Sequence, residues 1–395
     1  MRPLPGISVV VPVRNDPKHL ELCLQALSTS DHPEYEVLVV DDASTDETAE
    51  VARQAGVRML SQEVRTGPGQ ARNRGAREAR FPVLLFIDAD VCVRTETLRR
   101  VAEVFRDDEG VDALFGSYDQ SPGAPNLLSQ YRNLMHHYVH QAGNEEAGTF
   151  WSGCGAIRRD LFLELGGFDA GYGQASIEDI ELGARLRREG HRVVLVKDLQ
   201  VKHMKRWTLW SMIRTDVLHR GIPWTLLLLR EGRMPNDLNL RHSQRLSGLL
   251  SAGLVGTLLA GSWYYRSILL VPLALFLGLI GVDHWGRQRR IPLWGRIGGV
   301  VVFLLTVGSM LAYTAIGHNL YQLWILLAFG LLGCIVLLNL RFYLFFARVK
   351  HPLFGLAVIP LHVLYFVYSG VAFVVGVGLH LWHSMTRPTK AGAGA

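Results

Sequence analysis

A hydrophobic run that ends in two aspartates is the first feature of this chain that could do chemistry. Residues 84–93 read LLFIDADVCV, so Asp88 and Asp90 follow an apolar stretch and lie two positions apart. Unpaired carboxylates beside a buried strand are costly, so a cation or strong hydrogen-bond donors should lie opposite them. Because residues i and i+2 of a strand share a face, both could hold one divalent ion, or Asp90 could hold it while Asp88 contacts a ribose. Such oxygens suit Mg²⁺ or Mn²⁺ bridged to phosphates, and the alternative is two solvated turn aspartates.

Two other apolar stretches also end in polar residues. ISVVVPVRND brings Pro12 and Arg14 to the end of one strand, and YEVLVVDDAS brings Asp41 and Asp42 to the end of another. Open α/β sheets bind ligands at the carboxyl ends of their strands, so these clusters should converge on one crevice. A base and a ribose could lie over Pro12 and the two aspartates, with a pyrophosphate reaching the metal.

A glycine-rich turn offers a place for phosphates. GPGQARNRGA begins a helix whose first amides, near Gly69, favour anions, and Arg72 lies in its first turns. The segment matches neither GxxxxGK[ST] nor GxGxxG, which disfavours a phosphate-loop kinase and a dinucleotide-dependent reductase.

An acidic pair begins a later helix. IEDIELGARLRR is amphipathic, and Glu178 and Asp179 lie at its start. Carboxylates there could simply complement the helix dipole. Alternatively, one of them could stay ionised and act as a general base that accepts the proton of an acceptor hydroxyl.

The segment HMKRW follows another predicted strand. His203 is either a third metal ligand or a surface imidazole. Lys205, Arg206 and Trp207 could neutralise a diphosphate leaving group, and Trp207 could instead anchor the chain at a membrane interface.

The elements that must position these residues alternate between β-type and helical stretches over the first ~200 residues, which is typical of a mostly parallel sheet covered by helices. Strands are predicted at residues 7–13, 35–44, 57–60, 83–90 and within 191–203, with helices at 19–27, 46–54 and 67–80. Residues 118–151 are expected to form a mobile loop with a short helix. Its three histidines, His136, His137 and His140, are expected to lie on a solvated helix face rather than to bind metal.

Charge is divided unevenly along the chain. Residues 1–240 carry 29 Lys+Arg and 34 Asp+Glu, a balance of −5, whereas residues 241–395 carry 12 and 1, a balance of +11. In the second part the basic residues punctuate long apolar runs, which indicates a membrane domain and not a nucleic-acid-binding protein. The four cysteines are far apart and form no metal or disulfide pattern, which suits a reducing compartment.

Five apolar segments approach or exceed the ~20 residues that cross a bilayer. They cover residues 246–265, 267–282, 298–317, 319–340 and 353–381; one is short and one long, so four to six spans are expected, with five preferred. The loops 283–296 and 341–351 are basic, which places them and the front domain on the cytoplasmic face of a multi-pass cell-membrane protein.

Residues 207–240 connect the two parts. Trp207, Trp210 and Val217 recur at helical spacing beside Arg214, and Pro223 is expected to break the run. This pattern predicts a pair of amphipathic helices in the headgroup layer, with a core-facing helix as the alternative.

Residues 5–210 resemble the inverting family 2 glycosyltransferases, because VPVRND, VVDDAST, GPGQARNRGA, FIDAD, GGFD and IEDIELGARL occur in that family's order and separations. The resemblance implies an α/β catalytic domain of the GT-A fold, with a Rossmann-like, mostly parallel sheet. It also implies a nucleotide-diphosphate sugar as donor and Mg²⁺ or Mn²⁺ as cofactor. The expected organisation is a glycosyltransferase domain at 1–206, interfacial helices at 207–240 and an α-helical transmembrane domain at 241–395.

The resemblance also assigns roles to residues. It implies that Asp41 and Asp42 face the nucleoside, that Asp88 and Asp90 form the D-x-D metal motif, and that Asp179 is the catalytic base. The first motif has Arg14 where many members have an aromatic residue, and HMKRW matches only part of the Q-x-x-R-W motif of processive synthases.

The expected function is transfer of a sugar to a lipid-linked acceptor, which could be a polyprenyl phosphate, a polyprenyl diphosphate-sugar or a glycolipid. The expected partners are therefore the sugar nucleotide, this acceptor and the lipid bilayer. A processive polysaccharide synthase is one alternative, although its channel would need polar and aromatic lining that these apolar spans lack. A non-catalytic membrane scaffold is another, although a scaffold has no need of convergent carboxylates.

Overall fold

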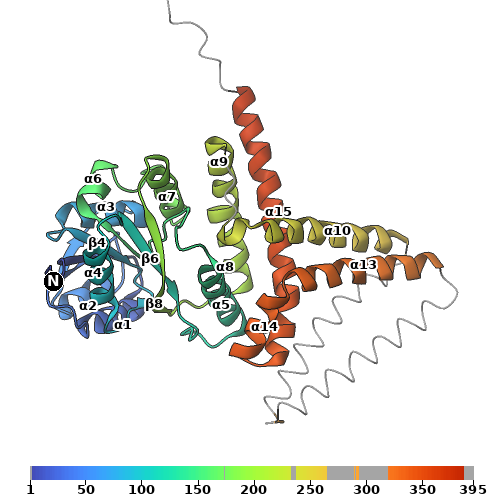
Figure 1. Ribbon diagram of the computed structural model, residues 1–395, viewed down its shortest axis with the longest axis horizontal. Coiled ribbons are helices and arrows are strands. Elements are labelled where there is room, and N and C mark those ends of the chain that lie inside the picture. Colours follow the sequence, from blue (N-terminus) through green and yellow to red (C-terminus); the bar gives the residue numbers. More distant parts are fainter. Residues whose placement is uncertain are drawn as a thin grey trace, which may run out of the picture. The chain divides into compact units, whose positions relative to one another are not determined.

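The computed structural model describes residues 2–172, 174–232, 237–264, 289, 291–292 and 319–386 (Figure 1). The chain divides into two compact units, Met1–Leu240 with Val375–Ala395, and Arg241–Val374.

The first unit is built on an eight-stranded sheet. Its strands are β1 (Ile7–Val13), β2 (Tyr35–Asp41), β3 (Arg58–Ser61), β4 (Val83–Ile87), β5 (Val91–Cys92), β6 (Ala113–Tyr118), β7 (Cys154–Arg158) and β8 (Val193–His203). They lie in the order β3-β2-β1-β4-β7-β6-β8-β5. Strands β3, β2, β1 and β4 are mutually parallel, and β6 is parallel to β8, whereas β7 is antiparallel to both of its neighbours. The predicted α/β class is confirmed, although β6 and β7 lie where the sequence analysis predicts no strand.

Helices cover both faces of this sheet. They are α1 (Pro17–Ser28), α2 (Thr48–Gln54), α3 (Pro68–Glu78), α4 (Thr97–Asp107), α5 (Leu127–Ala142), α6 (Arg159–Glu164) and α7 (Glu178–Arg188). Residues of α1, α2 and α4 pack into the apolar core on one face, and residues of α3, α6 and α7 pack into the core on the other (Figure 1). Helix α3 lies so close to the sheet that a Cβ at Gly75 would lie 2.4 Å from Cγ1 of Val10, so only glycine fits there.

Helix α5 corrects the prediction of a mobile loop with solvated histidines. It is a 16-residue helix, and His137 and His140 are buried. The His137 ring lies 2.6 Å from the carbonyl oxygen of Tyr118, and Arg132 forms a buried ion pair with Asp216. These polar groups of α5 therefore find partners inside the protein rather than in water.

The connecting segment also differs from its prediction. Helix α8 (Leu209–Arg214), a π-helix η1 (Thr215–Gly221) and α9 (Ile222–Glu231) follow one another directly, and a short 3₁₀ turn, η2 (Leu238–Leu240), comes later. Pro223 does not break the run, because it lies in the first turn of α9, where its missing N–H costs little. Trp207 precedes α8 and is buried, whereas Trp210 is 73% exposed.

The second unit contains long apolar helices, α10 (His242–Tyr264), α13 (Asn319–Leu338), α14 (Leu340–Val349) and the start of α15 (Pro352–Thr386). In the described part of the chain, α10 and α15 are long and apolar enough to cross a membrane. Helices α13 and α14 would add one more if their pair, bent by 68°, forms a single span. The spans predicted at 267–282 and 298–317 lie outside the described residues. At the bend, the Asn339 amide donates to Oγ of Ser247 at 2.8 Å, which joins α13 to α10.

Candidate active site

The cation that faces Asp88 is Arg72. Nη2 of Arg72 lies 2.5 Å from Oδ1 of Asp88 at the end of β4, and Nη1 lies 3.2 Å from Oε1 of Glu178 at the start of α7. Only 4% of the Arg72 side chain is exposed. Burial lowers the pKa of Arg72, but Asp88, Glu178 and Asp179 outweigh it and raise the pKa above its ordinary value. One buried guanidinium therefore joins the D-x-D segment to the acidic pair of α7.

Asp90 is paired with His203. Its Oδ2 lies 3.4 Å from Nε2 of the imidazole, because β5 and β8 pair through Val91 and His203. Burial raises the pKa of Asp90, but His203 and Lys205 outweigh this effect and hold the pKa well below its ordinary value. Asp90 is therefore ionised.

His203 is not a surface imidazole. It is 5% exposed, its ring stacks on Tyr118 with centroids 4.3 Å apart, and its Nδ1 lies 2.6 Å from Oδ1 of Asn133. An amide oxygen only accepts hydrogen bonds, so with the amide oriented in this way Nδ1 carries the hydrogen. Nε2 then either donates to Asp90 or presents a lone pair beside it.

The side chains at this site provide only part of what a divalent ion requires. Among the described residues, no three His, Cys, Asp or Glu side chains are grouped closely enough to hold a metal ion on their own. Asp90 and His203 form a pair, and Asp88 lies two residues away but contacts Arg72. Since Mg²⁺ is usually held by one or two carboxylates together with substrate phosphates, the residues fit an ion that binds together with a diphosphate.

Asp179 is held by the segment that precedes β7. Its Oδ2 accepts hydrogen bonds from the backbone N–H of Ser152 at 3.1 Å and from Oγ of Ser152 at 3.3 Å. Burial raises the pKa of Asp179 above its ordinary value, although Ser152, Arg72 and Arg220 oppose the increase. A fixed carboxylate with increased proton affinity has the properties of a general base.

Asp41 and Asp42 are both buried and organise the loops at the strand ends. Asp42 accepts the backbone N–H of Thr66 at 2.7 Å and that of Gly67 at 2.9 Å, which fixes the start of α3. Asp41 accepts the N–H of Ser44 at 3.1 Å. Contacts of these aspartates with a nucleoside remain a prediction.

The other predicted donor-side residues lie near the same strand ends. Pro12 is buried within β1, and Arg14 is exposed just after it. A Cβ on Gly69 would lie 3.4 Å from Cγ of Glu178, so α3 packs closely against α7. Arg206 is exposed.

Trp207 is a structural residue of this region rather than a membrane anchor. Its backbone N–H donates to Oγ of Ser129 at 2.7 Å, and its backbone carbonyl accepts from the side-chain amide of Asn126 at 2.8 Å. Nζ of Lys205 lies 4.7 Å from the centroid of its ring, a cation–π contact.

Three further residues that the fold brings to this site are not predicted from the sequence. Asn133 holds His203, Tyr118 stacks on it, and Arg220 lies with Nη1 3.4 Å from Nε2 of His136. The one sequence signal for Arg220 is an arginine next to a glycine between apolar stretches, which is too common to identify a site.

Comparison with known proteins gives a family for the first part of the chain. The family described as "Glycosyl transferase family 2" matches residues 8–166, which contain Asp41, Asp42, Arg72, Asp88 and Asp90. The match ends before α7, so the proposed roles of Asp179 and His203 depend on their geometry.

Individual relatives are named as glycosyltransferases. The chain is 33% identical over 123 residues to "Glycosyltransferase AglE" of Haloferax volcanii, an alignment that covers 29% of this chain and 40% of that protein. It is 35% identical over 114 residues to "Poly(ribitol-phosphate) beta-N-acetylglucosaminyltransferase TarS" of Staphylococcus aureus, covering 27% of this chain and 20% of that one. The matched part is thus less than two thirds of either relative.

Among solved structures, the chain is similar to "Mannosyltransferase PcManGT from Pyrobaculum calidifontis in complex with GDP-Man and Mn2+". The TM-score is 0.49 and the sequence identity 20%, with 85% of this chain and 87% of that one covered. On the sequence match, this chain carries a glycosyl transferase family 2 domain.

Proposed function

We propose that this protein transfers a sugar, with inversion, from a nucleotide-diphosphate sugar to a lipid-linked acceptor at a membrane surface. The observation that carries the proposal is the position of Arg72, whose guanidinium contacts Asp88 at a strand end and Glu178 beside Asp179. One buried cation thereby holds Asp88, which is assigned to the donor, and Glu178, which adjoins the proposed base Asp179. Arg72 and Asp88 lie within the residues that match the family 2 model.

The donor is assigned to the carboxyl ends of β1, β2 and β4. Pro12, Asp41 and Asp42 would border the nucleoside, and Arg206 would lie near the diphosphate. Asp88, Asp90 and His203 would hold Mg²⁺ or Mn²⁺, which when bound would neutralise charge on the departing diphosphate.

Asp179 is assigned the role of base. Its carboxylate, fixed by Ser152, would take the proton of an acceptor hydroxyl, whose oxygen then attacks the anomeric carbon on the face opposite the diphosphate. With an acceptor that is already a phosphate anion, Asp179 would instead position the attacking oxygen.

The lipid-linked nature of the acceptor is supported by the connecting segment and the apolar helices. Leu209, Trp210 and Leu218 are 43%, 73% and 53% exposed beside the basic Arg214, a combination suited to a headgroup layer. Candidate spans α10 and α15 provide anchoring. The basic loops of the second part favour a catalytic domain on the cytoplasmic side of the cell membrane.

A donor panel tests the proposal. The purified full chain is incubated in lipid nanodiscs with Mn²⁺, one sugar nucleotide at a time and membrane lipid extract, and the lipids are analysed by mass spectrometry. We expect one donor to add the mass of a single sugar to a lipid. The Asp198→Asn variant, altered at a carboxylate that is 66% exposed and paired with Arg100, should behave as the wild type. Sugar added only to soluble acceptors, or polymer in place of a single addition, would contradict the proposal.

A further inference from the structure

The π-helix η1 is fixed to the catalytic domain at several points. Asp216 forms a buried ion pair with Arg132 of α5, and Oγ of Ser176 donates to the carbonyl of His219 at 2.8 Å. The second bond ties η1 to the loop just before Asp179. A π-helical turn changes the direction in which the following side chains point, and such turns are frequent at functional sites.

Arg220, at the end of η1, has an unusual partner for a half-buried guanidinium. Its Nη1 lies 3.4 Å from Nε2 of His136. Burial, with Arg132 and Arg220 nearby, lowers the pKa of His136 well below its ordinary value, so this imidazole is a neutral acceptor. By contrast, Arg72 and Arg132 each hold a carboxylate. Within the part of the chain that the structure describes, no carboxylate forms an ion pair with Arg220, so its charge is available to an anion.

The charge of Arg220 acts on the catalytic groups. It opposes the increase that burial causes in the pKa of Asp179. The guanidinium and the Asp179 carboxylate therefore interact electrostatically.

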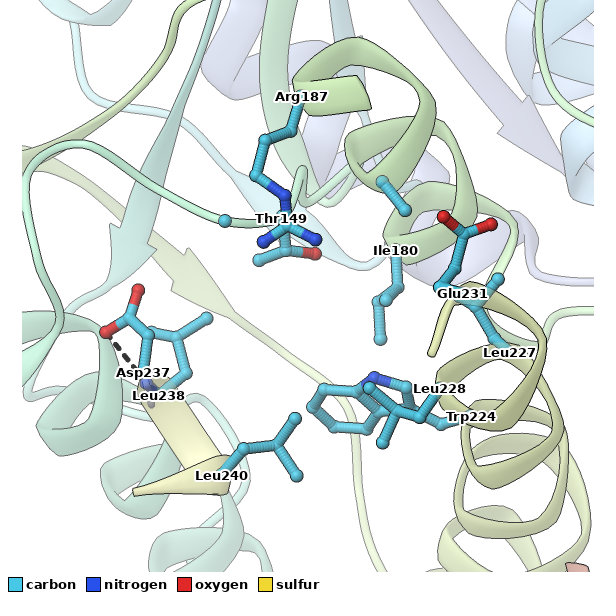
Figure 2. Close-up of a pocket in the computed structure, with 12 residues that line it drawn as sticks. Thr149, Ile180, Arg187, Trp224, Leu227, Leu228, Glu231, Asp237, Leu238 and Leu240 are labelled. Carbon is cyan, nitrogen blue, oxygen red and sulfur yellow. Dashed lines mark hydrogen bonds between the residues drawn. The ribbon is translucent and has the colours of Figure 1, made fainter. Parts of the chain in front are cut away.

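An apolar pocket lies along α9, the helix that directly follows Arg220 in the chain. It is a small hollow with a cavity volume of about 40 Å³, and it is open to solvent on one side. Figure 2 shows Trp224, Leu227 and Leu228 of α9 near Ile180 of α7, with Leu238 and Leu240 nearby. The wall is thus mainly apolar, and the polar groups at its edge include Arg187 and Glu231.

The pocket and the catalytic groups share the same three structural segments. Helix α7 supplies Asp179 to the site and Ile180 to the pocket. The segment before β7 supplies Ser152 to Asp179 and Thr149 to the pocket. The helical run η1–α9 supplies Arg220 and, one turn further, Trp224. A ligand with an anionic head near Asp179 could therefore place an apolar tail between α7 and α9.

We propose that Arg220 binds the phosphate of a lipid phosphate acceptor and that the first apolar groups of this lipid occupy the pocket between α7 and α9. The inference rests on the proposed function and narrows its acceptor to a lipid phosphate. A hydroxyl acceptor would leave the guanidinium uncompensated, whereas a phosphate matches its charge and hydrogen-bonding geometry. Arg220 also offsets repulsion between this phosphate and Asp179.

The reaction balances without a further reagent. A phosphate oxygen of the acceptor donates an electron pair to the anomeric carbon, and the bond from that carbon to the diphosphate oxygen breaks. The bonding pair leaves with the nucleoside diphosphate. No proton has to move when the acceptor is ionised.

Variants at two arginines of the same helical run test the inference. Arg220→Gln removes the charge at the site, and Arg230→Gln removes an exposed one ten residues later, in α9. In nanodiscs with undecaprenyl phosphate, we expect Arg220→Gln to raise the KM for this acceptor about 10-fold or more, since hydrogen bonds to charged groups are worth that much. The KM for the sugar nucleotide should stay within about twofold. Arg230→Gln should match the wild type in both.

A binding measurement separates this inference from the proposed function. Equilibrium binding of labelled farnesyl phosphate should weaken about 10-fold in Arg220→Gln, whereas binding of farnesol should not change. Loss of UDP or GDP affinity instead would assign Arg220 to the donor diphosphate and overturn the inference. Equal farnesyl phosphate binding by wild type and variant would also overturn it, whether or not transfer is observed. Transfer that is absent in the wild type, with binding still dependent on Arg220, would contradict only the proposed function.

Discussion

Arg72 of α3 and Asp88 at the end of β4 form an ion pair of 2.5 Å in which the guanidinium is almost completely buried. The same guanidinium contacts Glu178, which adjoins Asp179. The geometry of the D-x-D segment and that of the acidic pair therefore depend on one side chain. Any rearrangement of Asp88 on donor binding would be transmitted to α7.

Replacing Arg72 should be costly for stability. Arg72→Ala leaves Glu178, which is 5% exposed, without its cation, and breaking such a buried pair costs about 3–5 kcal/mol. Urea unfolding of the catalytic unit, monitored by circular dichroism, measures the change. Arg77→Ala, at an exposed position of the same helix, should change the free energy of unfolding by less than about 0.5 kcal/mol. An Arg72→Ala variant as stable as Arg77→Ala would show that the buried pair is not formed.

Asp90 should control metal-dependent donor binding. Its carboxylate is ionised beside His203, so Asp90→Asn removes the negative charge that an ion with a diphosphate requires. We expect calorimetry to show that Mn²⁺ strengthens sugar-nucleotide binding in the wild type and no longer does so in the variant. Asp119→Asn, at another aspartate that directly follows a strand, is the matched control. The same Mn²⁺ effect in the Asp90 variant would exclude Asp90 from the metal site.

His140 should make the catalytic unit sensitive to acid. Burial lowers the pKa of His140 to about 4, so the folded state resists protonation that the unfolded chain accepts near pH 6.5. The unfolded state therefore binds more protons between these values, and stability falls as pH decreases from about 6.5 to about 4, by about 3 kcal/mol in total.

Urea unfolding at pH 7 and pH 5 measures this effect. His140→Gln, which cannot be protonated, should lose less stability between the two values than the wild type. His191→Gln, at a more exposed histidine, should follow the wild type. Identical pH dependence in His140→Gln and wild type would mean that His140 does not contribute.

Gly75 should tolerate no larger side chain. Alanine normally stabilises a helix by up to about 1 kcal/mol over glycine, but here its Cβ would lie 2.4 Å from Val10. We expect Gly75→Ala to lower the free energy of unfolding by about 1–3 kcal/mol, measured in urea, because α3 must move away from the sheet. Gly56 is not a suitable comparison, because its positive φ disfavours any side chain there. Gln54→Ala, at an exposed position of α2, is therefore the control for helix propensity. A stabilised Gly75→Ala variant would show that α3 packs less closely than described.

The strands that carry the acidic residues could be predicted from the sequence, because β1, β2 and β4 are continuous apolar runs with polar residues directly after them. The partners of these acidic residues could not be predicted in the same way. The contacts of α5 show why, since His203 and Asn133 are 70 positions apart, and Arg132 and Asp216 are 84 apart. From the sequence, a helix that contains histidine and arginine is predicted to face solvent, because the residues that form hydrogen bonds and ion pairs with it lie so far away in the chain. The pairing of Asp88 with Arg72 is not predicted either, because the sequence suggests a metal ion as the cation that faces Asp88.

Asp179 provides the most direct test of the account, because it separates binding from chemistry. Asp179→Asn keeps the side-chain shape and can still contact Ser152, but it cannot accept the proton of an acceptor hydroxyl. Sugar-nucleotide affinity and transfer to lipid are measured on the same preparation. With an acceptor that carries a hydroxyl, the account predicts affinity within about twofold of the wild type and transfer reduced by about 100-fold or more, whereas transfer to a lipid phosphate, which needs no base, should fall much less. Full transfer to the hydroxyl acceptor by the variant, or loss of donor binding together with transfer, would contradict it.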